Sequence, residues 1–252
     1  MGEKARVVNY QKNDRVAFIT LNRPDKMNAL NVEAVKELRD AWLDFESDPD
    51  MRVAILTGSG RAFCTGMDLE ESKQGTRADI ESCIPNFGVE VTKPIVGAIN
   101  GWTIGAGMGL AVACDIRVMG ENAKFIFPEP KIGFAAGGDE FLSCMPYAIA
   151  MELFLTGEPL DAKRAYDVGI VNRVVPSGEL MNEAMKFANI IRENAPLTMK
   201  MLKMVAVTQT QSIRTAWLLM RSRYIRPQAE SEDFKEGLRA FAEKRKPVFT
   251  GK

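Results

Sequence analysis

The chain has 252 residues, of which 46% are hydrophobic, and its 33 basic and 33 acidic residues give a formal net charge of zero. This length is sufficient for a full core within one domain, and the neutral charge gives no reason to expect nucleic acid as a partner. The sequence has no histidine and no C-x-x-C pair among its four cysteines, which excludes Ser-His-Asp and Cys-His catalysis and argues against a zinc site or a disulfide scaffold.

The N-terminal stretch MGEKARVVNYQKNDRV has no apolar signal region, and no run of about 18 apolar residues occurs anywhere in the chain. We therefore expect a soluble, cytoplasmic protein that does not contact membranes. Its cysteines are expected to be buried and reduced. Any general acid or base must be a carboxylate, Lys, Tyr or Cys, since histidine is absent.

The N-terminal region predicts a strand pair and a helix. Val7–Tyr10 and Val16–Leu21 are expected to pair through a turn at Asn13-Asp14. Asn31 is expected to cap a helix that stops by Pro49. The apolar positions of this helix recur at three- and four-residue spacing: Val32, Val35, Leu38, Trp42 and Phe45.

Two later segments each place a glycine turn after an apolar strand. One runs from Val53 to a turn at Thr65-Gly66, and the other runs from Pro94 through Gly105 into a small-residue helix. Such glycines let backbone N–H groups approach an anion at the positive end of a helix. Two facing turns can each supply one donor to an oxyanion. Close helix packing is the alternative explanation, and no dinucleotide or phosphate-loop pattern is present.

The rest of the chain predicts alternating short strands and helices. Residues 70–85 are polar and are expected to form a solvated loop, a short helix or a mobile lid. The following elements are expected in order: strands at Ile116–Met119 and Phe125–Phe127, helices at Tyr147–Leu155 and Asp161–Val168, a strand at Val171–Val175, an amphipathic helix at Glu179–Glu193, and a Met-rich helical stretch from Pro196 that is either core or subunit interface.

Six segments in order resemble the enoyl-CoA hydratase/isomerase (crotonase) superfamily and cover nearly the whole chain. They are ITLNRPDKMNAL (19–30), VAILTGSGRAFCTGMDL (53–69), KPIVGAINGWTIGAGMGLAVACDIRV (93–118), AKFIFPEPKIGF (123–134), ELFLTGEPLDAKRAYDVGIVNRVVP (152–176) and EGLRAFAEKRKPVF (236–249). The resemblance implies an α/β fold with a crotonase-like ββα spiral (superhelix) as the acyl-CoA-binding core over residues 1–195. It also implies a C-terminal helical trimerisation region over residues 196–252, and therefore a homotrimer or homohexamer.

The resemblance also implies roles for individual residues. The backbone N–H groups of Met67 and Ala106 are expected to hold the thioester oxygen. Glu129 is the expected catalytic base, with its pKa raised by an apolar wall that includes Phe127 and Phe134. Asp139 and Glu140 are further candidates that could assist if their loop bends, although acids at a helix start have a plainer explanation in the helix dipole.

A coenzyme A thioester is expected as substrate, with no separate cofactor and no metal. The residues expected to contact it are Lys26, Met27, Ala29, Ala62, Cys64, Gly66, Met67, Asp68, Leu69, Gly105, Ala106, Phe241 and Lys244. Phe241 and Lys244 match a family tail that meets the adenine and phosphates of CoA, often from a neighbouring subunit. They lie in the last 32 residues, whose nine basic and five acidic residues give a local net charge of about +4.

The reaction depends on how many carboxylates the site contains. Hydratases of the family use two glutamates, and Gly109 stands where the first would be. A single carboxylate is enough to move a double bond, so we expect an enoyl-CoA isomerase. An enoyl-CoA hydratase or another acyl-CoA lyase or hydrolase is the alternative. A non-catalytic CoA- or RNA-binding protein is a third possibility. The acyl group is not defined by the sequence.

Overall fold

The computed structural model describes residues 6–73, 78–133, 139–220 and 231–250. Within these residues the strands form two sheets, a larger one in the order β1-β2-β3-β5-β7-β10 and a smaller one in the order β4-β6-β8-β9. The strands are β1 (Val8–Asn13), β2 (Val16–Leu21), β3 (Val53–Gly58), β4 (Ala62–Cys64), β5 (Ile95–Ile99), β6 (Trp102–Ile104), β7 (Ile116–Gly120), β8 (Lys124–Ile126), β9 (Leu160–Asp161) and β10 (Arg173–Val175).

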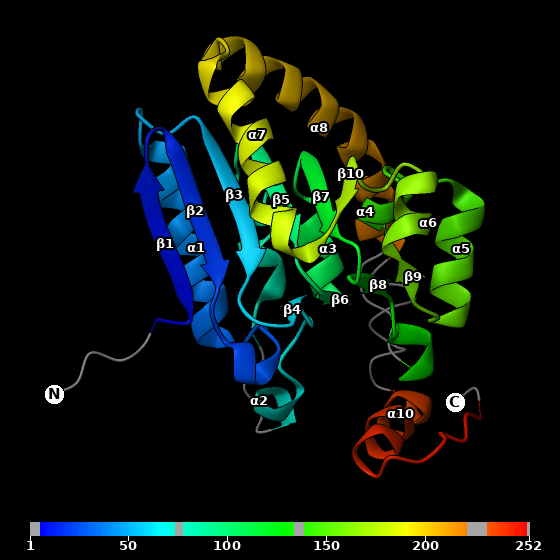
Figure 1. Ribbon diagram of the computed structural model, residues 1–252. Coiled ribbons are helices and arrows are strands. Elements are labelled where there is room, and N and C mark those ends of the chain that lie inside the picture. Colours follow the sequence, from blue (N-terminus) through cyan, green and yellow to red (C-terminus); the bar gives the residue numbers. More distant parts are fainter. Residues whose placement is uncertain (1–5, 74–77, 134–138, 221–230, 251–252) are drawn as a thin grey trace, which may run out of the picture.

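The helices lie around these two sheets (Figure 1). They are α1 (Val32–Ser47), α2 (Leu69–Lys73), α3 (Ala106–Val112), α4 (Asp139–Leu142), α5 (Tyr147–Thr156), α6 (Ala162–Asp167), α7 (Leu180–Glu193), α8 (Pro196–Met220) and α10 (Glu232–Ala242), with short 3-10 turns η1 (Pro24–Lys26), η2 (Ile80–Cys83), η3 (Glu129–Lys131) and η4 (Ser177–Glu179). No helix among the described residues is long and apolar enough to cross a membrane.

The N-terminal hairpin and first helix form where the sequence predicts them. β1 and β2 are antiparallel with Asn13 opposite Val16, and Asp14 and Arg15 form the turn with positive φ. The side chain of Asn31 accepts a hydrogen bond from Ala34 N at 2.9 Å and caps α1. Most of the expected apolar face of α1 is buried, but Val32 is 40% exposed. Val32, the first residue of α1, is therefore not part of the buried face of this helix.

Three consecutive units each send a first strand into the larger sheet and a second strand into the smaller one. These units are β3–β4–α2, β5–β6–α3 and β7–β8–η3, and their strands pair in parallel with those of the next unit. The backbone of Gly107 packs directly on the preceding unit, because a Cβ there would lie 2.1 Å from Cys64 O. This repeated arrangement is the expected ββα spiral. Close packing between its units, the alternative explanation for the glycines, accounts for Gly107.

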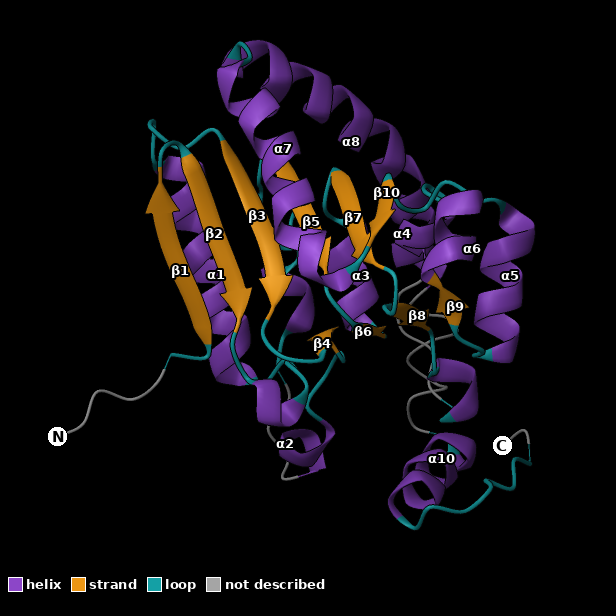
Figure 2. Cartoon of the chain, viewed as in Figure 1, coloured by secondary structure: helices purple, strands orange, loops and turns teal. Residues whose placement is uncertain are grey.

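Both faces of the larger sheet are covered (Figure 2). Successive residues of β3 point to opposite faces: Val53 and Ile55 pack with the buried side of α7, whereas Ala54 and Leu56 join the core that includes α1. A strand buried on both faces explains its continuous apolar sequence. The sheet therefore holds the strand ends, from which the glycine turns project, on a rigid base.

The C-terminal helices contact this core at Lys203 of α8 and at Gly237 of α10, among other positions. Lys203 of α8 is almost buried and its Nζ contacts Lys93 O at 2.8 Å and Asp115 Oδ2 at 2.9 Å. On α10, a Cβ at Gly237 would lie 2.0 Å from Ile132 O, so this helix packs on the loop that follows η3. Glu129 begins η3, so α10 is linked to the segment that carries this candidate residue.

Candidate active site

The two glycine turns predicted to face each other are in contact. Gly66 has a φ of +82°, and a Cβ at this position would lie 2.9 Å from Ile104 O and 3.2 Å from Ala106 N. Only glycine allows this approach, since any side chain would enter the space between the turns. Met67 and Ala106 therefore lie at a single point of backbone contact between the turns.

The backbone hydrogen bonds around Met67 and Ala106 do not use the N–H groups of these two residues within the described part of the chain. Leu30 N donates to Gly66 O at 2.7 Å and Asp68 N donates to Leu30 O at 3.0 Å, so neither bond of this parallel bridge involves the Met67 N–H. Ala106 is the first residue of α3, where N–H groups have no partner within the helix. Among the described residues, no backbone oxygen accepts a hydrogen bond from either group.

Glu129 lies against the second of these turns. Its side chain is buried, at 8% exposure, and a Cβ at Gly105 would lie 3.0 Å from its Oε1. Gly105 has a φ of +53° and is the residue before Ala106. The structure thus brings a carboxylate oxygen next to the turn that contains one of the two candidate donors.

An aromatic cluster forms around Phe127, two residues before Glu129. Phe127 packs on Phe141 of α4 and Phe154 of α5, with ring centroids 5.8 Å and 4.8 Å away. The apolar wall expected around Glu129 stays a prediction: Phe127 packs in this aromatic cluster, and Phe134 lies outside the described residues. Asp139 and Glu140 begin α4 in the backbone trace, and their side chains also lie outside the described part.

The segment expected to line the CoA arm is joined to the first turn. Met27 has positive φ, and its carbonyl accepts a hydrogen bond from Thr65 Oγ1 at 3.2 Å. Lys26 is half exposed and pairs with Glu70 at 2.6 Å, which raises the pKa of the lysine. Ala29 accepts a hydrogen bond at its carbonyl from Arg23. Met27 is therefore joined directly to the turn that carries Met67, and Lys26 to the helix that follows it.

The remaining predicted residues divide into a buried and an exposed group. Ala62 and Cys64 are fully buried in β4, and burial raises the pKa of the Cys64 thiol to about 12, so it is inert. Leu69 begins α2. Phe241 is 61% exposed on α10, and Lys244 follows that helix with positive φ. Only these last two lie on an element far along the chain.

Two residues of this region were missed by the sequence analysis. Arg23 pairs with Asp68 at 2.9 Å, and Asn28 is buried and holds the carbonyls of Ser59 and Ala62 through Nδ2. Asn28 has a φ of +57°, a conformation that asparagine tolerates better than most residues. The sequence signal for Asn28 was an asparagine in the loop between a predicted strand and a predicted helix.

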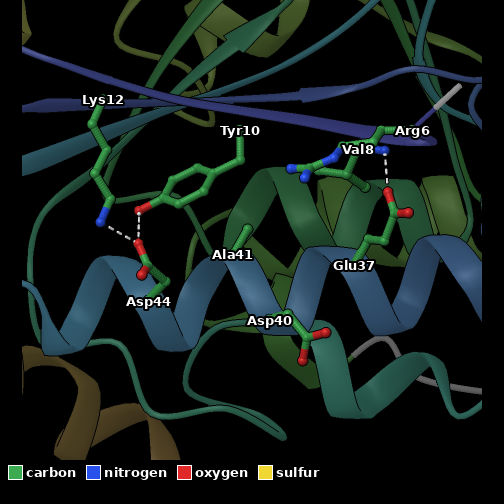
Figure 3. Close-up of a pocket in the computed structure, with 8 residues that line it drawn as sticks. All are labelled: Arg6, Val8, Tyr10, Lys12, Glu37, Asp40, Ala41 and Asp44. Carbon is green, nitrogen blue, oxygen red and sulfur yellow. Dashed lines mark hydrogen bonds and ion pairs between the residues drawn. The ribbon is translucent and has the colours of Figure 1, made fainter. Parts of the chain in front are cut away.

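A separate groove of about 720 Å³ lies between β1 and α1 and contains none of the predicted site residues (Figure 3). Several of its polar groups bond to one another: Tyr10 donates to Asp44 at 2.8 Å, and Val8 N donates to Glu37 at 2.8 Å. Burial and the contact with Asp44 raise the pKa of Tyr10 above its ordinary value. We attribute this groove to the packing of the edge strand on α1.

Comparisons with known proteins agree over nearly the full length. A profile of the family described as enoyl-CoA hydratase/isomerase matches residues 11–252. The chain is 37% identical to an (E)-benzylidenesuccinyl-CoA hydratase of Thauera aromatica, with 97% of this chain and 99% of the relative covered. It is also 37% identical to a carnitinyl-CoA dehydratase of Proteus mirabilis, with 94% and 95% covered.

A solved structure matches the fold. The crystal structure of a carnitinyl-CoA hydratase from Mycobacterium avium superposes with a TM-score of 0.87 at 32% identity, and the match covers 99% of this chain and 100% of that chain. The relatives are named as a hydratase and a dehydratase of CoA thioesters, and none of these three names describes an isomerase. On the family match, the sequence identity and the shared fold, the chain belongs to the enoyl-CoA hydratase/isomerase family and is an acyl-CoA-processing enzyme.

Proposed function

We propose that this enzyme catalyses the reversible addition of water to the C2–C3 double bond of an enoyl-CoA thioester. The position of Glu129 carries the proposal: its buried Oε1 lies against Gly105, immediately before the N–H of Ala106. Three relatives named as hydratases or dehydratases support the same chemistry, because these names describe one reaction in its two directions.

In the proposed mechanism the thioester oxygen accepts hydrogen bonds from the N–H groups of Met67 and Ala106. Glu129 takes a proton from water while the water oxygen bonds to C3, and the electron pair of the double bond moves to form an enolate. The negative charge then lies on the thioester oxygen between the two donors, each worth roughly 3 to 4 kcal/mol of barrier. Glu129 finally returns its proton to C2, which restores the carboxylate.

A single carboxylate completes this cycle because it takes one proton and returns it. The absence of a carboxylate at Gly109 is therefore compatible with hydration. In this proposal Lys26, Met27 and Ala29 line the path of the CoA arm, and Phe241 and Lys244 receive its adenine and phosphates. No cofactor beyond the CoA thioester itself is required, because every proton and electron pair in the step comes from substrate, water or Glu129.

Isomerisation is the second candidate, and Gly109 favours it. This residue is buried inside α3 and offers no second carboxylate to hold a water molecule. Glu129 would then remove a proton from C2 of a 3-enoyl-CoA and return it to C4. The same oxyanion contacts would stabilise the dienolate, so the two reactions differ only in whether water bonds to C3.

Incubation in ¹⁸O-labelled water separates the candidates. We expect a panel of 2-enoyl-CoAs to give 3-hydroxyacyl-CoAs that contain the label, measured by mass spectrometry. Unlabelled conversion of 3-enoyl-CoA to 2-enoyl-CoA as the only reaction would instead establish the isomerase.

The variant Glu129→Gln should lower kcat by at least about 100-fold, because general acid–base catalysis typically contributes that much. Glu121→Gln is the control, since Glu121 is exposed in the turn after β7. An unchanged rate in Glu129→Gln would refute both reactions as written.

A further inference from the structure

The turn that carries Met67 depends on contacts from outside its own ββα unit. β4 ends at Cys64 and α2 begins at Leu69, so the intervening residues belong to no sheet or helix. Their backbone is held by the bridge to Leu30, with hydrogen bonds of 2.7 Å and 3.0 Å on either side of Met67. The direction of the Met67 N–H is therefore set by the segment that contains Leu30.

That segment is itself in an uncommon conformation. Met27 and Asn28 have φ values of +50° and +57°, which non-glycine residues adopt only when the surroundings impose them. Arg23 supplies two of the restraints: its N–H donates to Asn28 Oδ1 at 2.9 Å, and its Nη1 donates to Ala29 O. Arg23 thus holds the loop segment that forms the bridge to the Met67 turn.

The same guanidinium also holds the turn directly. Arg23 Nη2 lies 2.9 Å from Asp68 Oδ2, and the two side chains are only 16% and 8% exposed. Asp68 Oδ1 accepts hydrogen bonds from the N–H groups of Glu70 and Glu71 at 3.1 Å and 3.2 Å. Both carboxylate oxygens are therefore occupied by protein groups, and Asp68 is placed to hold the turn rather than to contact substrate.

The charge of Asp68 is maintained by these contacts. Burial alone would raise the pKa of Asp68, but the hydrogen bond from Arg23 and those from the backbone of Glu71 and Glu70 outweigh it and hold the pKa below its ordinary value. A charged, planar pair of this kind fixes direction as well as distance, because the guanidinium nitrogens lie in one rigid plane.

We propose that the Arg23–Asp68 pair positions the Met67 N–H as an oxyanion donor. The Arg23 guanidinium binds Ala29 O in one segment and Asp68 in the other, and these two segments meet at the Leu30–Met67 bridge. Neither residue touches the reacting atoms, so both are positioning residues. This inference rests on the proposed function only for the identity of the bound oxygen, a thioester carbonyl.

The test measures carbonyl polarisation directly. Butyryl-CoA labelled with ¹³C at its carbonyl is saturated and does not react, so its bound infrared frequency reports the two donors whatever reaction the enzyme performs. We expect the carbonyl band to shift to lower frequency in the wild type. Most of that shift should be lost in Arg23→Met, and part of it in Asp68→Asn, while the Kd of CoA without an acyl group stays within about threefold.

Arg192→Met is the matched control. Arg192 also joins a carbonyl and a carboxylate, Asp14 O at 3.2 Å and Asp14 Oδ2 at 2.5 Å, with a side-chain exposure of 22%. Its removal should leave the band unchanged. If Arg23→Met does not fold, Arg23→Lys takes its place, because lysine keeps the charge but cannot occupy both acceptors in one plane.

Turnover gives the second readout. The expected loss for Arg23→Met is about 100-fold in kcat with little change in KM, the size typical of removing one oxyanion donor. A carbonyl shift that survives in both Arg23→Met and Asp68→Asn overturns the inference, as does a wild type without any shift. A wild type that polarises butyryl-CoA but adds no water to enoyl-CoAs refutes the proposed function and leaves this inference intact.

Discussion

Gly105 satisfies two requirements that no other residue meets together. Its φ of +53° and ψ of −121° lie in a region that only glycine enters readily. Its missing side chain also leaves room for Glu129, because a Cβ there would lie 3.0 Å from Oε1. One residue therefore sets both the direction of the following N–H and the place of the carboxylate.

Gly105→Ala should impair both catalysis and stability. The substitution costs about 1 to 3 kcal/mol of backbone strain, and displacement of the carboxylate by a fraction of an ångström is expected to lower kcat by about 10- to 100-fold. Steady-state kinetics and thermal unfolding measure the two effects. Gly169→Ala is the control, because Gly169 has a φ of +82° but no atom within 4 Å of its Cβ position. Equal losses of activity in both variants would contradict this account.

At the scale of single residues, the sequence predicted the glycine turns but not the side-chain hydrogen bonds that hold them. Alternating glycines after apolar strands are a local pattern, so the facing turns of Gly66 and Gly105 could be expected from the sequence alone. Arg23 and Asn28 act on residues up to 45 positions away. Nothing in their local sequence indicates those partners, since the contacts arise only when the ββα units stack.

At the scale of single elements, α10 and the chain that follows it form one folded unit. Ser231 caps the helix by accepting a hydrogen bond from Phe234 N at 3.1 Å. Arg245 donates hydrogen bonds to the Glu236 carboxylate from Nη1 at 2.5 Å and from Nη2 at 3.0 Å, and Val248 N donates to the same carboxylate at 3.1 Å. This carboxylate therefore holds the chain end against the helix that packs on the loop after Glu129.

The attachment should weaken in acid. The hydrogen bonds from Arg245, and then that from Val248 N, lower the pKa of Glu236 from 4.5 to about 2. Since the folded-state pKa is depressed, the stabilisation is complete above about pH 4.5 and is lost as the pH falls towards about 2. Denaturant unfolding should find Glu236→Gln less stable than the wild type at pH 6, by a margin that shrinks over that range. Glu90→Gln, at an exposed site, is the control. A margin independent of pH would contradict the assignment.

The secondary structure of the core was largely predictable, whereas the placement of α10 was not. Strands such as β5 are continuous apolar runs, and Asn31 and Asp161 cap their helices as short polar residues do. Very short strands such as β4 and β6 were not predicted as strands, because three residues carry no periodicity. The contact of Gly237 with Ile132 depends on the fold of the whole chain.

At the scale of the whole molecule, α8 has two different faces. Lys203 fastens one face to Lys93 and Asp115, whereas Leu197, Met201 and Val205 are 77%, 69% and 60% exposed. These three are spaced by four residues and so form one apolar stripe. Met201 is therefore not part of the core, and the other interpretation of the Met-rich stretch, a subunit interface, stays a prediction.

We expect the stripe to be covered in a homotrimer or homohexamer. Met201→Lys should then reduce the assembly to smaller species in sedimentation velocity, because a charge would be buried without a partner. Leu155→Lys on α5 makes the same change at a site 71% exposed and should leave the assembly intact. A wild type that sediments as a monomer would refute the predicted trimer and hexamer.

The use of main-chain donors has a consequence for how such an enzyme diversifies. In the proposed mechanism the peptide groups at positions 67 and 106 activate the thioester, and the side chains there only border the acyl group. Mutational drift at these two positions can therefore reshape acyl preference while the activating groups persist in every variant. Selectivity and reactivity are in this sense inherited separately, which suits a scaffold shared by enzymes with different acyl-CoA substrates.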